Sequence, residues 1–235
     1  MLSRTLRRAL VAPALFMAMG SAHAADLTVT ITNLTNGIYY TPFLVAAHTE
    51  DSRIFRSGEA ASPSLQAMAE GGDISGLVTD LTGIGATLVE NPAGGLLAPT
   101  ESTTTNVNTD GTDNVRLSVV AMLLPTNDAF MGLNGILIPT EPGTYVYNVN
   151  AYDAGTEAND EIVNGGGAPG VPGIPAAPGG SGTGATGAAG PDTNQTVHIH
   201  RNTLGDVDDV GGVSDLDSRV HRWLNPVARV TVVVN

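Results

Sequence analysis

Hydrophobic and polar residues alternate strictly near the start of the chain. In the segment Leu27–Asn33, leucine, valine and isoleucine alternate with threonine. A period of two places the apolar side chains on one face, so this segment predicts a strand with one buried and one solvated side. A turn signal follows at Asn36-Gly37, and Ile38–Ala47 predicts a second strand. Pro42 lies within that second run and indicates an edge position or a bulge.

Three further segments carry the apolar or β-branched residues that are typical of strands. Val115–Leu124 is strongly apolar, which predicts a central strand that is buried on both faces towards its end. Tyr145–Tyr152 combines aromatic and β-branched residues, and Val227–Val234 ends the chain with a valine-rich run. Shorter strands are predicted at Ala86–Val89, Ile136–Pro139 and Thr196–Arg201.

The segment 49–114 is the least strand-like part of the chain. Ser62-Pro63 has the pattern of a helix start, and Gly71-Gly72 has the pattern of a helix end. Residues 73–81 predict another short helical turn. Residues 83–112 are rich in Gly, Pro, Thr and Asn and predict covering or functional loops. The whole pattern predicts an all-β fold, an antiparallel β-sandwich with short helices and long loops.

Composition narrows the possible functions. The chain has 235 residues and no cysteine, which excludes disulfides, zinc–thiolate sites and thiol nucleophiles. All ten basic residues are arginine, and the formal net charge is −13. This charge argues against nucleic acid, and against an anionic membrane surface, as a partner, because both attract basic proteins.

Residues 1–24 have the organisation of a signal peptide. Three arginines precede the apolar stretch Ala9–Gly20, which is too short to span a bilayer. Ala22-His23-Ala24 is a cleavage site of the A-x-A type, and cleavage there removes three arginines and no acid, which leaves a net charge of −16. We therefore expect a secreted or periplasmic protein whose single domain occupies residues 25–235, with no membrane span.

Two polar turns follow apolar strands and supply oxygen ligands. Asp153 and Glu157 enclose the sequence Ala-Gly-Thr after the strand at 145–152, and the glycine lets the backbone turn so that the two carboxylates converge. Asp128 and Asn134 follow the strand at 115–124. Oxygen donors of this kind favour a hard cation, and Ca²⁺ is the expected ion. The alternative for the 153–161 stretch is a solvated acidic loop with an Asx-turn.

Three stretches together resemble the spondin N-terminal domain, a β-sandwich related to C2 domains and found in secreted matrix proteins and many bacterial exported proteins. Pro125–Asn134 is similar to the family's Ser-Pro-Asp-Trp-Phe-x-Gly-x-Asp loop, and Asp153–Glu157 is similar to its Asp-Ala-Gly-Thr-Asp turn. The tail Val220–Val232 is similar to the family's closing strand with its preceding aromatic residue. The resemblance extends over about 27–235 and implies a C2-like sandwich.

The resemblance also implies a Ca²⁺ ion at the loop end of the sandwich. It carries over to Asp153 and Glu157 in one turn, and to Asp128 and Asn134 in the other loop. Glutamate replaces the family's aspartate at 157, and asparagine replaces aspartate at 134, which lowers the ligand charge. Ala129 stands where the family has tryptophan, and the family's cysteines are absent.

Residues 165–191 are rich in glycine and proline. From Gly167, glycine occupies every third position until Ala176 interrupts the collagen-like repeat. So few triplets are too short for a stable triple helix, which also needs glycine without exception at its axis. The segment therefore predicts a flexible insertion that tolerates deletion, and a trimerising stalk is the alternative.

Histidines and further aspartates give weaker candidates. His198 and His200 lie on one strand face, and with His221 they could bind zinc or copper; the alternative is a polar face with surface imidazoles. The five aspartates of 204–217 lack the glycine and glutamate positions of an EF-hand and predict a solvated loop.

No catalytic motif emerges, because the chain lacks a Gly-x-Ser-x-Gly elbow, a His-Glu-x-x-His motif and a phosphate loop. The sequence therefore predicts an exported Ca²⁺-binding module that acts by binding or adhesion to an unidentified protein or glycan partner outside the cytoplasm, without catalysis. Two alternatives stay open: a hydrolase of envelope polymers, and a structural secreted protein without a specific ligand.

Overall fold

The computed structural model describes residues 25–188, 194–208 and 210–235, so the predicted signal peptide lies outside the described residues. Within them the chain forms two helices and ten strands. The helices are α1 (Pro63–Gly71) and α2 (Ser75–Thr82). The strands are β1 (Asp26–Asn33), β2 (Tyr39–Tyr40), β3 (Leu44–His48), β4 (Thr87–Glu90), β5 (Ser102–Asn108), β6 (Arg116–Leu124), β7 (Ala129–Leu137), β8 (Gly143–Asp153), β9 (His198–Ile199) and β10 (Ala228–Val234).

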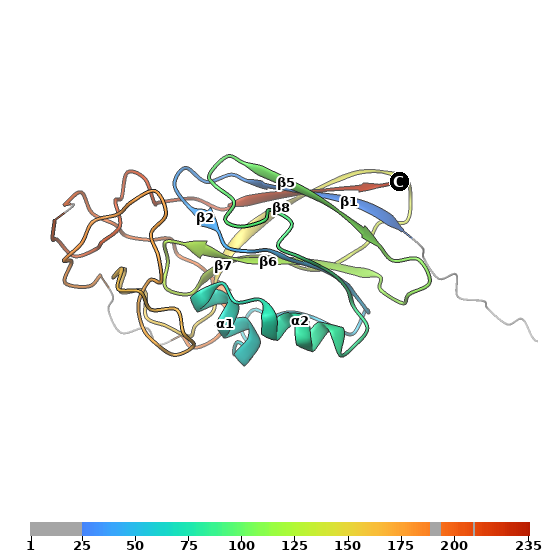
Figure 1. Ribbon diagram of the computed structural model, residues 1–235, viewed down its shortest axis with the longest axis horizontal. Coiled ribbons are helices and arrows are strands. Elements are labelled where there is room, and N and C mark those ends of the chain that lie inside the picture. Colours follow the sequence, from blue (N-terminus) through green and yellow to red (C-terminus); the bar gives the residue numbers. More distant parts are fainter. Residues whose placement is uncertain (1–24, 189–193, 209) are drawn as a thin grey trace, which may run out of the picture.

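The strands form an antiparallel sheet that folds into two layers (Figure 1). The strand order is β4-β3-β6-β7-β8-β10-β1-β5, with β2 beside β6 and β9 beside β8. The long strand β8 joins the two halves, because residues 143–149 pair with β10 and residues 150–153 pair with β7. This arrangement confirms the predicted all-β fold and the antiparallel sandwich.

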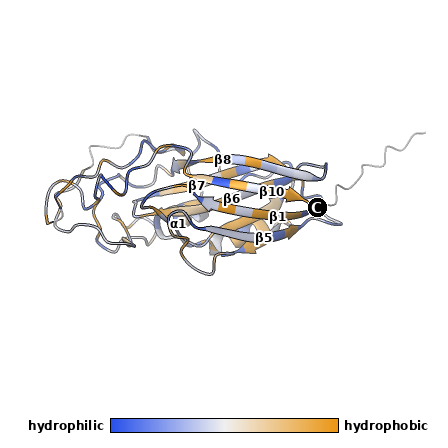
Figure 2. Cartoon of the chain, turned by 90° about the horizontal axis from the view of Figure 1, so that it is seen from above, coloured by the Kyte–Doolittle hydropathy of each residue, from blue (hydrophilic) through white to orange (hydrophobic). Residues whose placement is uncertain are grey.

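The main core lies between the two layers. Leu27, Val29 and Ile31 of β1 are fully buried, and the threonines between them are partly exposed, which confirms the predicted alternation. Val119 of β6 and Val230 of β10 belong to the same cluster. Figure 2 shows apolar and polar bands along the strands. Each aliphatic side chain buried in this way contributes about 1.5–3 kcal/mol relative to an exposed one.

The two helices cover the outer face of the layer that contains β6 and β7 (Figure 1). Helix α1 begins and ends as predicted: the Ser62 hydroxyl accepts a hydrogen bond from the Leu65 amide (3.1 Å), and Gly72 ends the helix in a left-handed conformation. Leu65 and Met68 of this helix form a second core with Phe130 of β7. The short apolar side of the helix is therefore what attaches it to the sheet.

Two strand predictions are corrected by the structure. The run Ile38–Ala47 is not one strand, because β2 and β3 are separated around Pro42, which has no amide proton for sheet pairing. The strand β5 lies within the stretch that was predicted to be loops. Its residues are mostly threonine and asparagine, and only Val107 is buried, so the hydrophobic pattern of a strand is missing.

The largest correction concerns residues 129–135, which the sequence predicted to be a polar loop. They form most of β7, and both faces of this part of the strand are largely buried, so no alternation is visible in the sequence. Gly132 allows the ring of Phe55 to pack directly on the strand, since an added Cβ would lie 2.7 Å from that ring. The glycine serves close packing here and does not mark a turn.

The packing of Phe130 gives a test of the second core. Its ring contacts those of Phe55 and Tyr152, with centroid distances of 5.1 Å and 5.7 Å. We expect Phe130→Ala to lower the free energy of unfolding by about 3–5 kcal/mol, because it leaves a cavity under α1. The exposed control Val146→Ala on β8 should change it by less than about 0.5 kcal/mol. Urea unfolding measures both, and equal losses would contradict the described packing.

Candidate metal centre

The pairing of β7 with β8 brings two predicted ligands to one end of the sandwich. Ala129 pairs with Asp153, so Asp128, the residue before β7, lies beside the end of β8. The Ala154 amide donates a hydrogen bond to the Asp128 carbonyl oxygen (3.2 Å). In Figure 1, the loops that follow β8 gather at this end, opposite to the C terminus of the chain.

The turn after β8 folds over the Asp128 carboxylate. Its Oδ2 accepts hydrogen bonds from the Thr156 amide (2.9 Å), the Thr156 hydroxyl (3.2 Å) and the Glu157 amide (3.2 Å). Gly155 makes this turn possible, because its φ is +71° and an added Cβ would lie 2.7 Å from backbone atoms of Thr196. The turn therefore places the backbone of Thr156 and Glu157 directly on the Asp128 carboxylate, at the end of the strand that carries Asp153.

Two buried carboxylate oxygens of this group have no hydrogen-bond partner among the described residues. Asp128 is fully buried, and its Oδ1 is one of them. The other is Oε1 of Glu157, a residue that is 7% exposed. The second oxygen of Glu157 accepts from the Gly173 amide (3.2 Å) and the Asn127 side chain (3.4 Å). Because an unpartnered buried oxygen is costly, a proton, a cation or a buried water would stabilise these atoms.

The buried environment raises the pKa values of both Asp128 and Glu157. Burial, and then the negative charge of Asp153, raises the pKa of Asp128 from 3.8 to about 7, although hydrogen bonds from the turn oppose the shift. Burial is also the main reason why the pKa of Glu157 rises from 4.5 to about 7; the Gly173 hydrogen bond opposes this rise, and the charge of Glu70 adds to it. A bound cation would act in the opposite direction, because it favours the ionised forms.

Asp153 lies between the turn and two histidines. Its Oδ1 accepts from the Gly155 amide (2.8 Å), and its Oδ2 accepts from the Asn159 side chain (2.8 Å). The Nε2 atoms of His198 and His200 each lie 3.8 Å from that Oδ2. The predicted histidine pair is therefore adjacent to the carboxylate of Asp153.

Asn134, the fourth predicted ligand, lies apart from the other three. It is six residues beyond Asp128 along β7, which corresponds to about 20 Å in an extended strand. Its Oδ1 accepts from the Ile54 amide (3.2 Å), and its side-chain amide donates to the Phe55 carbonyl oxygen. A loop could have returned Asn134 to the site, but a strand carries it away.

The described residues also bear on the other metal hypotheses. In residues 25–188, 194–208 and 210–235, no group of three or more His, Asp or Glu side chains is arranged to hold a metal ion. His221 accepts a hydrogen bond from the Asp217 amide at Nδ1 (3.0 Å) and stabilises its own turn. A Ca²⁺ ion at the Asp128 group would therefore need further oxygen ligands from backbone, amide groups or water.

Sequence reasoning missed the amide side chains that support the turn. The Asn127 side chain donates to Asp160 (2.8 Å), and its oxygen accepts from the Glu161 amide (3.2 Å). Asn159 donates to Asp153 and accepts from His200 Nε2 (3.0 Å). Their only signal in the sequence is that they lie next to or within a few residues of predicted ligands.

The glycine- and proline-rich segment also contacts this region, which its composition did not predict. The Gly173 amide binds Glu157, and the Gly170 amide donates to Oε2 of the buried Glu70 of α1 (2.6 Å). Ile174 is fully buried, and its amide donates to the Ile162 carbonyl oxygen (2.8 Å). Residues 165–188 thus have defined contacts, and residues 189–191 lie outside the described part.

Comparison with known proteins agrees with this fold. The sequence model of the Spondin_N family matches residues 30–162, more than half of the chain, and includes Asp128 and the turn at 153–157. The tail at 220–232, which also carried the resemblance, lies outside the matched range. A search of curated proteins gave no match.

The raised pKa values predict how stability depends on pH without metal. The folded protein holds protons on Asp128 and Glu157 between about pH 4 and pH 7, where the unfolded chain has released them. The free energy of unfolding of the chelated protein should therefore fall as pH rises through this window. We expect Asp128→Asn to flatten this dependence, and Asp110→Asn, at an exposed position, to leave it unchanged. Urea unfolding across this pH range gives the measurement, and a parallel curve for Asp128→Asn would refute the assignment.

Proposed function

The chain belongs to the Spondin_N family, and from this premise we propose that it is an exported Ca²⁺-binding β-sandwich module that acts by binding or adhesion outside the cytoplasm. Family membership supports an extracellular, β-rich module. The candidate metal centre supports the calcium part of the proposal.

The observation that carries the calcium proposal is the pair of unpartnered buried oxygens on Asp128 and Glu157. Carboxylate oxygens are the ligands that Ca²⁺ prefers, and a cation would stabilise two such oxygens in a protein interior. Asp128, Glu157 and the adjacent Asp153 are the residues that would hold the ion. Asn134 is not part of this ligand set, because it binds the 54–55 segment.

Bound Ca²⁺ would supply positive charge that neutralises the carboxylates. The residues of the chain then determine what this ordering achieves. Asp128 already holds the Thr156 and Glu157 amides, and Glu157 holds Gly173, so the ion would fix the turn to β7 and to the following segment. An ordered turn of this kind has a lower entropy cost when a partner binds it.

The surface that this turn presents is the proposed contact for a partner. Gly155–Ala158 form one side of a shallow hollow of about 110 Å³, and Asn194 and Gln195 form the other. Its exposed groups are amides, hydroxyls and backbone, which suit hydrogen bonding to a protein or a glycan. The partner we propose is therefore a protein or glycan outside the cytoplasm.

We propose binding and not catalysis for this centre. Asp128 and Asp153 are buried and engaged by the turn, so a polymer substrate would not reach their carboxylates. A hydrolase of envelope polymers would need an acid and a base or nucleophile that face the substrate. The unpartnered buried oxygens of Asp128 and Glu157 favour a specific ion-dependent module over a purely structural protein.

Export is proposed from the leader-like residues 1–24 together with family membership. In the part of the chain that the structure describes, no helix combines the length and the apolar character needed to cross a membrane. Secretion and a periplasmic location are both compatible with this proposal.

Calcium titration tests the proposed function. In calorimetry, the chelator-stripped protein should bind about one equivalent, and Ca²⁺ at a hundredfold excess over Kd should raise Tm by about 5–10 °C. Asp128→Asn and Glu157→Gln should lose most of this rise, because each removes an unpartnered charged oxygen.

Asp110→Asn is the matched control, since it removes one exposed carboxylate from a loop outside the centre. It should retain the full Ca²⁺ response. If the wild type and both site variants showed an equal rise in Tm, the ion would bind elsewhere. If calorimetry detected no Ca²⁺ binding to the wild type and its Tm did not rise, the calcium proposal would be wrong.

A further inference from the structure

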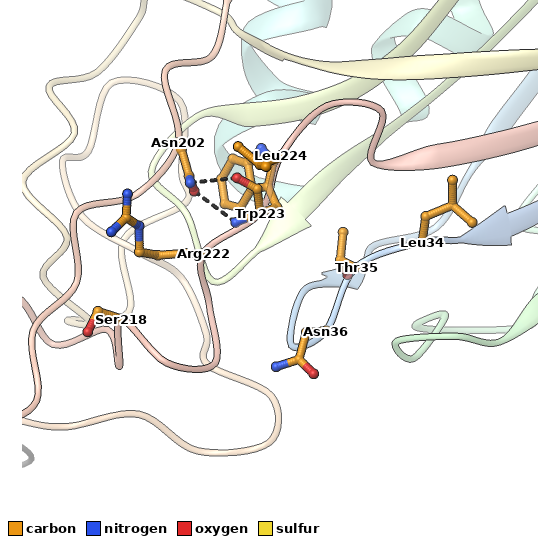
Figure 3. Close-up of a pocket in the computed structure, with 8 residues that line it drawn as sticks. All are labelled: Leu34, Thr35, Asn36, Asn202, Ser218, Arg222, Trp223 and Leu224. Atoms are coloured by element: carbon orange, nitrogen blue, oxygen red, sulfur yellow. Dashed lines mark hydrogen bonds between the residues drawn. The ribbon is translucent and has the colours of Figure 1, made fainter.

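An open pocket of about 610 Å³ lies beside the tail segment before β10, and none of Asp128, Asp153 and Glu157 lines it. Figure 3 shows its walls: the turn Leu34–Asn36 on one side, Arg222 on the other, and Trp223 and Leu224 between them. This volume is within the range of about 300–1,000 Å³ that is typical of ligand sites. Nothing in the proposed calcium function uses these residues.

The walls of this pocket are held in place by hydrogen bonds. The Asn202 side chain donates to the Trp223 carbonyl oxygen (2.6 Å) and accepts from the Trp223 amide (3.1 Å), as Figure 3 shows. On the opposite wall, the Asn36 side chain donates to the Val220 carbonyl oxygen (3.3 Å). The turn and the tail also approach closely, because an added Cβ at Gly37 would lie 2.5 Å from Val220. Because these hydrogen bonds order the pocket before a ligand arrives, binding has a smaller entropy cost.

The charge of the pocket is opposite to that of the chain. Among the described residues that line it, Arg222 is the only charged one and none is a carboxylate, although the chain has 23 acidic residues and ten arginines. Arg222 is exposed, and the ion pairs among the described residues engage Arg116 and Arg219 instead. A guanidinium in such a position fits a carboxylate, which it can bind through two parallel hydrogen bonds.

The remaining surface of the pocket is apolar. Leu224 is 86% exposed and Leu34, on the wall opposite Arg222, is 38% exposed, so both offer aliphatic surface to a ligand in the pocket. Trp223 is only 7% exposed, and its ring packs against His200 with a centroid distance of 5.3 Å. The aromatic face that a sugar ring would stack on is therefore covered, which favours a peptide over an acidic glycan.

We propose that this pocket binds a peptide segment of a partner protein that presents a carboxylate flanked by apolar side chains. Arg222 binds the carboxylate, and Leu34 and Leu224 contact the flanking side chains. The site is separate from the proposed calcium centre, so either can fail in a test without the other.

The probe is the capped pentapeptide Gly-Leu-Asp-Leu-Gly, and its control is the same peptide with asparagine in place of aspartate. Calorimetry with the purified full chain measures binding, and the fluorescence of Trp223, the only tryptophan, gives a second readout. We expect saturable binding of the aspartate peptide and about tenfold weaker binding of the asparagine peptide, because a charge-assisted hydrogen bond is lost.

The variants assign the contacts. Arg222→Gln should lower the affinity for the aspartate peptide about tenfold, so that this variant no longer prefers it to the asparagine peptide. Leu224→Ser should lower the affinity for both peptides. Arg229→Gln on β10 is the matched control, since it removes one exposed positive charge outside the pocket and should bind as wild type. Equal affinity for both peptides, an unaffected Arg222→Gln variant, or stronger binding of an oligogalacturonate than of the peptide would each overturn the proposal.

Discussion

Burial of carboxylates without arginine partners is the constraint on which the loop end of this sandwich depends. The acids buried there are Glu70, Asp128, Asp153, Glu157, Glu161 and Asp215. In the described part of the chain, no arginine forms an ion pair with any of them. A carboxylate that leaves water must receive hydrogen bonds, a proton or a cation, and the loops are arranged around that requirement.

Most of these acids are satisfied by backbone amides, which explains how long loops with little regular structure keep a defined path. Glu161 accepts from the Leu204 and Gly205 amides and from the Ser214 hydroxyl. Asp215 accepts from the amides of residues 163 and 185 (2.8 Å and 3.1 Å). Part of the acidic charge of the chain therefore has a structural role, because buried carboxylates accept hydrogen bonds from loop backbone amides that have no partner in a helix or sheet. Asp128 and Glu157 differ, since each keeps one oxygen that has no donor in the part of the chain that the structure describes.

How much the sequence could predict follows from how local each feature is. The alternation in β1 and the cap of α1 are set by neighbouring residues and were predicted correctly. β7 was not, because both of its faces are largely buried and Gly132 serves packing against Phe55 from another part of the chain. The convergence of Asp128 and Asp153 could be predicted from the order of strands and turns, whereas the exclusion of Asn134 depends on the corrected strand. The role of the 165–188 segment could not be predicted, because its composition contains no sign of the acids that bind its amides.

The candidate metal centre and the Arg222 pocket share one supporting network. Asn159 binds Asp153 on one side and His200 on the other. The Asn202 amide donates to Nδ1 of His200 (3.0 Å), so the imidazole carries its proton on Nε2, towards Asn159. The Asn202 side chain then fixes the backbone of Trp223 in the pocket wall.

Substitutions within this network would disturb both regions at once, so a loss of function there would not identify the site responsible. Arg222 and Leu224 lie on the exposed side of the pocket, and Oδ1 of Asp128 lies at the buried side of the metal centre. These groups lie outside the shared hydrogen bonds. For that physical reason they are the positions at which the two sites can be separated by experiment.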